Sequence, residues 1–450
     1  MSAARLQTNL LLQAGRLLLE YNESTAEIQR ALISTANALT DRTCHVAVSY
    51  GSVAVSLGGE GPALESVREL HYNTAVQARV HEILAQVRLG QLDTETAISR
   101  LHSVEADTPR HSRWVTALAL GAAAASLARL LGADQVAAGV AGIATSLGLL
   151  ARQELGRLYF SLLALPLIAA FIGAILGGSV IRLGWTRTPE LVLVVPALMV
   201  VPGPHLINGL LDLIDNYLPM SLARLGLATG ILLASAAGII LGVELTLSDP
   251  VSADQATSTD HLNLAFDVVL AGIVTCGFAV FYNTRGRPLW MAVAGGMTGH
   301  GIRFLALEAG CGLEVATFLG GLVIGVISAW MVRFSRTPVA VIAFAGAVTM
   351  IPGMSLYRAL SGTLKLARLP EMTHPRTVEG ALGNALHGGL IVGVLVLGLI
   401  LGARVVLMLA GTYDLPRRSR SVHEPNETAR QIPVEPVDPA PETRLTESAQ

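Results

Sequence analysis

Charge is scarce in this chain: only 14% of its 450 residues are Asp, Glu, Lys or Arg, whereas 52% are hydrophobic. An ordinary soluble domain has about 25% charged residues, so this shortage indicates that lipid surrounds much of the protein. Most of the charges lie in residues 1–113 and 415–450, and long apolar runs fill the interior. The composition therefore predicts a membrane protein with two polar ends.

Other absences narrow the function. The three cysteines, Cys44, Cys276 and Cys311, are too few and too scattered for a disulfide framework or a CxxC metal site. A net charge of −2 leaves no electrostatic footprint for nucleic acid. The sequence also contains no GxSxG, HExxH or Gly-rich phosphate loop. We therefore expect reduced thiols, no metal, no cofactor and no nucleic-acid partner.

Residues 1–109 are predicted to form a soluble α+β domain on the cytoplasmic side. Glu20 interrupts the first apolar stretch and no small-residue cleavage pattern is present, so we do not expect a signal peptide. Valines alternate with small or polar residues around Tyr50-Gly51, which predicts a β-hairpin. Helical spacing of apolar residues predicts helices at residues 10–21, 25–39, 74–89 and 93–105.

This N-terminal segment leaves an alternative function open. It carries residue types found in hydrolases, namely His45, His71, His81 and His102 with Asp41, Ser49 and Glu60. No catalytic motif joins them, so a regulatory, gating or assembly role is favoured over catalysis.

Ten apolar segments are predicted to cross the membrane, because a spanning helix needs roughly 20 predominantly apolar residues. The first five lie within residues 110–245, at 114–131, 135–150, 158–181, 191–201 continuing past Pro202, and 222–243. The other five lie within residues 263–412, at 264–282, 289–307, 313–332, 339–351 continuing past Pro352, and 381–409. A polar extracytoplasmic linker, 246–262, joins them, and the Pro-rich cytoplasmic tail 413–450 is expected to be disordered.

The two halves resemble each other at an unusual feature. The segment that starts at Thr186 matches the one that starts at Ser335, with Pro202-Gly203 aligned to Pro352-Gly353 after one inserted residue. Proline removes a backbone donor, so each pair should break its helix at membrane depth; a simple helix end at the interface is the alternative. Because five is an odd number, two successive copies enter the membrane from opposite sides, which predicts two five-helix inverted repeats with a site between them.

Arginines near the span ends set the orientation. They precede the first span and follow the sixth and tenth, whereas the central linker has no Lys or Arg. Most of the arginines near span ends therefore place both termini in the cytoplasm, although Arg182 and Arg187 fall on the outside in this scheme. We expect a multi-pass protein of the cell (plasma or inner) membrane. All four tryptophans lie near predicted span ends, as in an aromatic belt.

Polar residues follow each predicted break. In the first half they form a stripe on one helical face, His205, Asn208, Asp212 and Asp215, and the second half has Ser355, Arg358, Gly362 and Lys365 at the corresponding positions. One stripe is acidic and the other basic, so together they could recognise a zwitterionic amino acid. The alternative is two amphipathic hairpins whose polar faces touch water or headgroups.

Further polar residues lie inside other predicted spans: Asp267, His300, Arg303, Asn384 and His387. Ionisable groups are costly in lipid and by default face a cavity or a partner, which favours a polar pathway. Histidine titrates near physiological pH, so His205, His300 or His387 could carry a proton.

Five motifs together resemble the bacterial threonine/serine exporters, which are related to fungal pheromone-regulated membrane proteins. They are LLLQAGRLLLEYNESTAEIQRAL, QLDTETAISRL, VVPGPHLINGLLDL, GFAVFYNTRGRPLWMAVAGGMTGHGIRF and MIPGMSLYRAL, and the similarity extends from about residue 10 to about residue 409. The resemblance implies a ten-span fused exporter of threonine and serine that uses the proton motive force. Its partners would be a small amino acid, protons and the lipid bilayer, and homo-oligomerisation stays open.

The resemblance also carries over residues by position. These are Pro202, Gly203, Asn208 and Asp212 in the first half, and Asn283, Arg303, Pro352, Gly353, Tyr357 and Arg358 in the second. His205 and His387 have no anchor in the family pattern, so their roles rest on the physical argument alone. Two other readings remain: a membrane-anchored hydrolase or regulatory protein that acts through its N-terminal domain, and a sensor or channel that does not pump.

Overall fold

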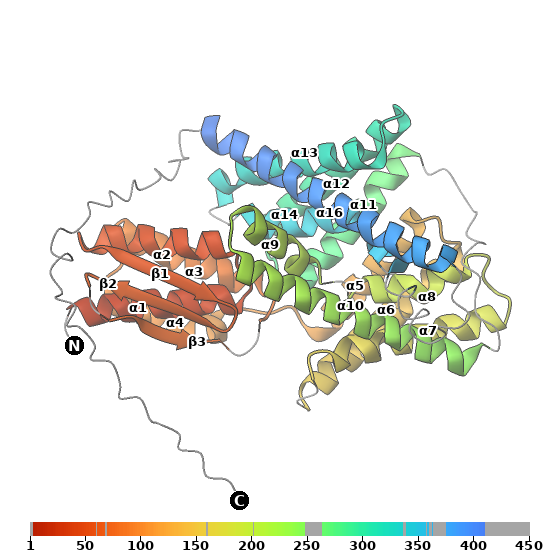
Figure 1. The fold of residues 1–450 in the computed structure, drawn as a ribbon, viewed down its shortest axis with the longest axis horizontal. Coiled ribbons are helices and arrows are strands. Elements are labelled where there is room, and N and C mark those ends of the chain that lie inside the picture. The colour runs from red at the N-terminus through yellow and green to blue at the C-terminus, as the bar shows by residue number, and fades with distance from the viewer. Residues whose placement is uncertain are drawn as a thin grey trace, which may run out of the picture.

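A computed structural model of the protein describes residues 3–59, 61–67, 70–158, 161–200, 202–247, 263–335, 339–356, 358–359, 362 and 375–409. Within these residues, an N-terminal α/β part stands beside a bundle of helices (Figure 1). Most of the predicted linker, the predicted tail, Glu60, Tyr357 and Lys365 lie outside the described residues.

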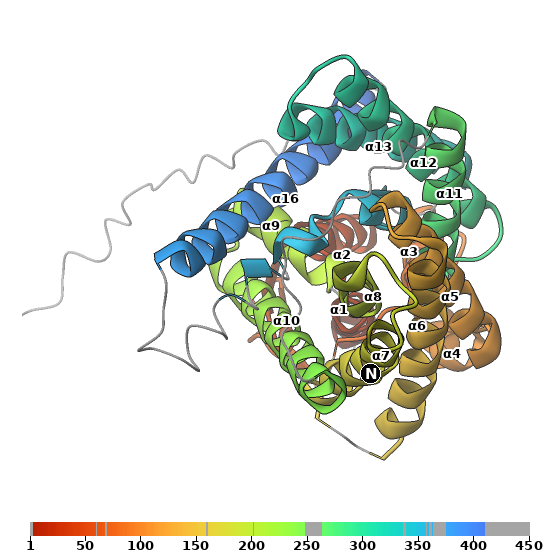
Figure 2. The same ribbon diagram turned by 90° about the vertical axis from the view of Figure 1, so that its right-hand side faces the viewer.

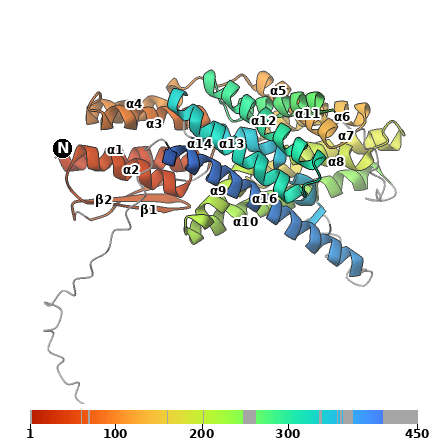
Figure 3. The same cartoon turned by 90° about the horizontal axis from the view of Figure 1, so that it is seen from above.

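The N-terminal part consists of three layers (Figure 3). An antiparallel sheet in the order β1 (Cys44–Ser49), β2 (Ser52–Leu57) and β3 (Ala63–Ser66) forms the first layer. Helices α1 (Ala3–Glu20) and α2 (Thr25–Leu39) form the middle layer, and α3 (Thr74–Arg88) and α4 (Thr94–Asp107) form the third. The predicted helices and hairpin are confirmed, and β3 is an additional strand that the sequence analysis missed.

The middle layer explains the apolar character of α1. A helix covered on both sides needs apolar residues around most of its circumference. Leu10, Leu11, Leu17, Leu18 and Leu19 are accordingly all buried, because α1 packs on β2 on one side and on α4 on the other. The packed core fixes the positions of the loops that connect the elements of the N-terminal part.

The membrane part contains a helix at each of the ten predicted segments. They are α5 (Arg113–Leu130), α6 (Gln135–Gly156), α7 (Ala164–Arg182), the pair α8 (Pro189–Leu198) and α9 (Gly203–Ile214), α10 (Leu218–Thr246), α11 (Leu264–Phe281), α12 (Arg287–Glu308), α13 (Leu313–Ser335), α14 (Val339–Ala347) followed by the 3-10 turn η2 (Val348–Met350), and α16 (Pro375–Leu409). By length and composition, six of the described helices can cross a membrane: α6, α7, α10, α11, α13 and α16. The bent pair α8 and α9 makes a seventh if it is one span.

The same helix pairs recur in both halves. Helix α7 packs on α10 as α13 packs on α16, and α5 packs on α6 as α11 packs on α12. Glycines allow the closest of these contacts. Gly238 and Gly242 of α10 face the backbone of α7, and Gly398 and Gly402 of α16 face the backbone of α13, each pair with the spacing GxxxG. The matched glycines place two helix pairs backbone to backbone.

Helix α8 occupies the interior of the first half. Seen along the bundle, it lies among α5, α6, α7 and α10 (Figure 2). Every residue from Glu190 to Leu198 is buried, as expected for a helix without a polar face. In contrast, large apolar side chains are exposed on the outer helices, and all four tryptophans are exposed, Trp185 among them in the connection between α7 and α8. Such an apolar exterior suits a lipid surrounding.

Candidate functional site

The backbone breaks between α8 and α9. Pro202 takes φ −70° and ψ 62°, and the two helices meet at a bend of 64°. Pro196 inside α8 and Pro204 in the first turn of α9 remove two more backbone donors near this bend. The predicted helix break at Pro202-Gly203 is confirmed.

The breaks of the two halves pack against each other. A Cβ built on Gly203 would lie 3.1 Å from Cδ1 of Ile351, and one built on Gly353 would lie 2.9 Å from Cδ2 of Leu198. Each glycine therefore contacts an apolar residue that comes just before the other break. This juxtaposition places the two Pro-Gly pairs in one central region of the membrane part.

The stripe on α9 faces the N-terminal part. The side-chain amide of Asn208 donates to the Asn22 carbonyl at 2.6 Å, and the backbone N–H of Thr25 donates to the Asp212 carboxylate at 3.0 Å. Asn208 and Asp212 are both fully buried. The loop between α1 and α2 is thus anchored to α9.

Arg224 completes this docking site, and the sequence analysis missed it. Its guanidinium lies 3.3 Å from the Asp212 carboxylate and also donates to the Glu23 carbonyl. The side chain is fully buried in α10. An arginine at the start of an apolar run is a signal that could have been noticed, although one of its partners, Glu23, comes from a distant segment.

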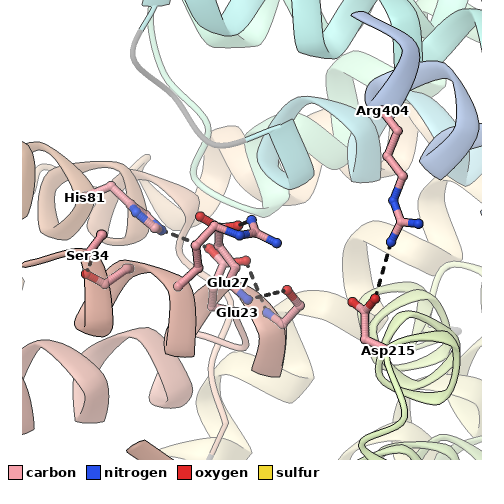
Figure 4. A network of polar contacts seen from close by, with 9 residues as sticks. Glu23, Glu27, Ser34, His81, Asp215 and Arg404 are labelled. Atoms are coloured by element: carbon pink, nitrogen blue, oxygen red, sulfur yellow. Dashed lines mark hydrogen bonds and ion pairs between the residues drawn. The ribbon is translucent and has the colours of Figure 1, made fainter. Parts of the chain in front are cut away.

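In the described residues, the charged side chains of the acidic and basic stripes pair with residues outside the two stripes. Arg358 forms two hydrogen bonds of 2.8 Å with Glu190, a residue that the sequence analysis did not single out. Asp215 lies 3.4 Å from Arg404 of α16 (Figure 4). Among the described residues, then, the acidic stripe pairs with Arg224 and Arg404, and Arg358 of the basic stripe pairs with Glu190. The polar face of α9 is turned toward the N-terminal loop.

Two further stripe positions lie at the α16 surface: Ser355 sits beside Gly388, and Gly362 sits beside Ala381. His205 is 3% exposed and packs its ring on Tyr72, with the centroids 5.5 Å apart. His205 thereby joins the N-terminal part to the first turn of α9.

A second buried polar cluster joins α11 and α12. Nδ1 of His300 lies 2.7 Å from the Asp267 carboxylate, and Arg303 lies 3.4 Å from Nε2 of the same imidazole. Asp267 and His300 are 6% and 5% exposed. All three residues were predicted from the sequence but not as partners, and the structure brings them together.

The remaining predicted residues lie apart from these clusters. Asn283, with φ 58°, donates to Asn73 and to the Pro109 carbonyl, so it also contacts the N-terminal part. Asn384 donates to a carbonyl of its own helix, and His387 lies 3.7 Å from Glu314. Neither α16 residue reaches the break through a described contact.

A pocket opens beside the break at the end of the membrane part that faces the N-terminal part. Its empty space is about 420 Å³, including some that is open to the surroundings. Residues from six segments line it, among them Tyr72, Arg152, Pro202, Phe278 and Tyr282. The pocket thus combines one cation with aromatic rings and with backbone released from helical pairing.

In the N-terminal part, the histidines do not gather around a nucleophile. His81 lies 3.3 Å from Glu23, His102 contacts Gln13 at 2.9 Å, and the Ser49 hydroxyl pairs with that of Ser52. Burial lowers the pKa of His81, but the hydrogen bond and charge of Glu23 outweigh it and hold this pKa above the ordinary value. In the described part of the chain, no group of three or more His, Cys, Asp or Glu residues could hold a metal ion.

Comparison with known families covers most of the chain. A family model described as a threonine/serine exporter matches residues 9–246. A second model, described as Threonine/Serine exporter, ThrE, matches residues 267–405. No solved structure matches the chain.

Proposed function

Because the chain belongs to the threonine/serine exporter family, we propose that it expels threonine and serine from the cell by antiport with protons. Membership of this family supports the export of amino acids by a multi-pass membrane protein. The hydroxylated substrates and the coupling to protons form our proposal for this chain.

The proposal includes an architecture of ten spans in two oppositely inserted repeats, residues 110–245 and 263–412, with residues 1–109 and both termini in the cytoplasm. Its support is the recurrence of the helix pairs α7–α10 and α13–α16, each held by a GxxxG pair. Two copies with opposite insertion would place their broken helices around one axis.

One observation carries the proposal: the Pro-Gly breaks of the two halves are in contact. Non-helical backbone at membrane depth is stable only where protein or a water-filled cavity satisfies its polar groups. In secondary transporters such broken helices meet at the substrate site, and one half rocks against the other around it. Gly203 and Gly353 would then mark the centre of the substrate pathway.

Proton coupling is assigned to Asp267, His300 and Arg303. A carboxylate and an imidazole 2.7 Å apart can share a proton, and both are buried between helices of the membrane part. Moving one charge through about 100 mV supplies roughly 2.3 kcal/mol, which corresponds to a gradient of a few tens-fold for a neutral solute.

Efflux from liposomes tests this function. The full chain would be reconstituted, loaded with labelled threonine, and assayed with and without an imposed pH gradient, with serine and larger amino acids as competitors. We expect the gradient to drive threonine uphill and serine to compete best. Threonine flux that is absent, or that ignores the gradient, would contradict proton-coupled export.

A regulatory role of the N-terminal part is a second proposal. It is favoured by the docking of residues 22–25 on Asn208, Asp212 and Arg224, directly after the first break. Hydrolysis has no comparable support among the described contacts. Liposome efflux that rises when this docking is weakened, with threonine affinity unchanged, would indicate that the N-terminal part restrains transport.

A further inference from the structure

Arg152 of α6 stands out among the arginines of the membrane part. Arg224, Arg303, Arg358 and Arg404 each contact an acidic or imidazole side chain. Arg152 is partly buried and makes no hydrogen bond or ion pair with any described residue. A guanidinium held away from bulk water needs an anion to offset its loss of hydration. Nothing in the described part of the chain supplies that anion.

The guanidinium lies in the lining of the pocket beside the break. Arg152 also lines a second, adjoining pocket, together with Met199, Val200 and Phe281. No Asp or Glu lines either pocket. Among the described residues, the cation is thus the only ionised side chain in the combined lining, so the pocket favours a solute with a negative group.

Polar groups without partners face the same region. The Tyr72 hydroxyl is buried and has no hydrogen-bond partner among the described residues, and Nδ1 of His205, whose ring packs on Tyr72, also has none among them. The Tyr282 hydroxyl lies 3.9 Å from the position of a Cβ on Gly203, so it points at the break. Burial raises the pKa of Tyr72, which keeps its hydroxyl protonated and able to donate. Buried polar groups without partners are rare enough to call for a ligand or a water.

The other walls suit the rest of a small amino acid. Phe278 and Phe281 line the pocket, and the face of an aromatic ring can attract an ammonium group. Pro202 and Pro204 bring the first turn of α9 into the lining, and the positive end of that helix favours a carboxylate.

We propose that this pocket binds a small α-amino acid, with Arg152 holding its carboxylate and Tyr72 donating a hydrogen bond to the same ligand. The inference rests on the proposed export function and assigns its loading site on the cytoplasmic side. It makes the N-terminal part a contributor to the site, because Tyr72 comes from the segment before α3.

Direct binding to the purified full chain tests the site. The probes are threonine, threoninol, which lacks the carboxylate, and 3-hydroxybutyrate, which lacks the ammonium. We expect the wild-type protein to bind threonine at least tenfold better than either analogue. The Arg152→Gln variant should bind threonine about thirtyfold or more weakly and should lose the preference for threonine over threoninol.

Two variants separate this role from a general loss of structure. Arg157→Gln removes an exposed arginine from the same end of α6, where it pairs with Glu154 at 2.9 Å, and should leave binding unchanged. Tyr72→Phe keeps the ring against His205 but removes the hydroxyl, and should weaken threonine binding about threefold to tenfold.

Three outcomes would overturn the site: threonine binding to Arg152→Gln at wild-type affinity, equal binding of threonine and threoninol to the wild type, or no binding of any probe. Equal binding of threonine and 3-hydroxybutyrate would reduce it to a general carboxylate site and so overturn the assignment to amino acids. Threonine efflux by the wild-type protein is measured in parallel and tests export separately. If the wild type exports threonine but Arg152→Gln binds threonine as well as the wild type does, the binding site is refuted and the export function is not.

Discussion

The Asp212 carboxylate and the Arg224 guanidinium lie 3.3 Å apart, and neither side chain is more than 1% exposed. Each also holds the N-terminal loop, since Asp212 accepts from the Thr25 N–H and Arg224 donates to the Glu23 carbonyl. Two charges removed from water need both each other and additional hydrogen bonds. The ion pair is therefore complete only while the N-terminal part is docked.

Replacing Asp212 should loosen that docking. Asp212→Asn leaves the Arg224 charge buried without compensation, which costs about 3 to 5 kcal/mol. We expect faster hydrogen exchange at residues 22–28 and a lower thermal midpoint. Asp215→Asn is the control, because Asp215 is 29% exposed and 3.4 Å from its partner Arg404, so its effect should stay below about 1 kcal/mol. Unchanged exchange in Asp212→Asn would show that the loop is held elsewhere.

The Asp267 and His300 pair should be needed for uphill export but not for exchange. In Asp267→Asn, His300 has no carboxylate with which to share a proton. A pH gradient should therefore no longer drive threonine accumulation, whereas exchange of threonine across the membrane should continue. Efflux and counterflow from the same liposomes measure the two activities. Glu314→Gln, at the looser 3.7 Å contact with His387, is the matched control. Gradient-driven accumulation by Asp267→Asn would refute the assignment.

Stability of the N-terminal part should depend on pH through His81. Glu23 and Glu27 raise its pKa above the ordinary value near 6.5, against burial and the charge of Arg88. A raised pKa in the folded state means that the stabilisation is fully present below about pH 6.5 and is lost as pH rises through the folded pKa.

Hydrogen exchange of α3, corrected for intrinsic rates, checks this dependence. We expect up to about 2 kcal/mol more protection at low pH in the wild type, and no such gain in His81→Gln. His102→Gln should behave as the wild type, because His102 contacts Gln13 and not an acid. The same pH dependence in His81→Gln would assign it to another group.

The glycines of α10 give a test of helix packing within one helix. A Cβ on Gly238 would overlap the Leu167 carbonyl oxygen, and backbone cannot move aside easily. Gly238→Ala should therefore destabilise the protein by about 1 to 3 kcal/mol. Gly226, with no atom within 4 Å of its added Cβ, is the control, and Gly226→Ala should stabilise α10 slightly. Thermal midpoints in detergent compare the two, and equal midpoints would contradict the close α7–α10 contact.

Local patterns predicted most elements of the fold. Apolar spacing located the helices of the N-terminal part and a helix at every predicted apolar segment, and proline located the break after α8. Strand β3 was missed because its sequence, ALES, has no β-branched or aromatic residue. Its place is fixed by pairing with β2, where Val53 faces Glu65. Such pairing is a tertiary effect that outweighs local propensity.

The site was predictable in its residue types but not in its pairs. Asp212 was identified as part of a polar stripe on one helical face, and Asp267 and His300 because charge in an apolar run requires a partner. Several partners lie far away in sequence: Asn208 binds Asn22, 186 residues earlier, and Arg358 binds Glu190, 168 residues earlier. No periodicity encodes such distances. Arg152 could have been noticed as a cation near the end of an apolar helix, but only the pocket shows that it lacks an anion.

The N-terminal part is fastened at two separate places. One fastening is the loop on α9 and α10, and the other joins Asn73 and Thr74 to Tyr282 and Asn283 at the end of α11. If the segments before and after the central linker swing apart during a transport cycle, a stiff body bridging them cannot follow both. One fastening would have to open in every turnover, so the lifetime of these few hydrogen bonds would set an upper limit on the speed of export.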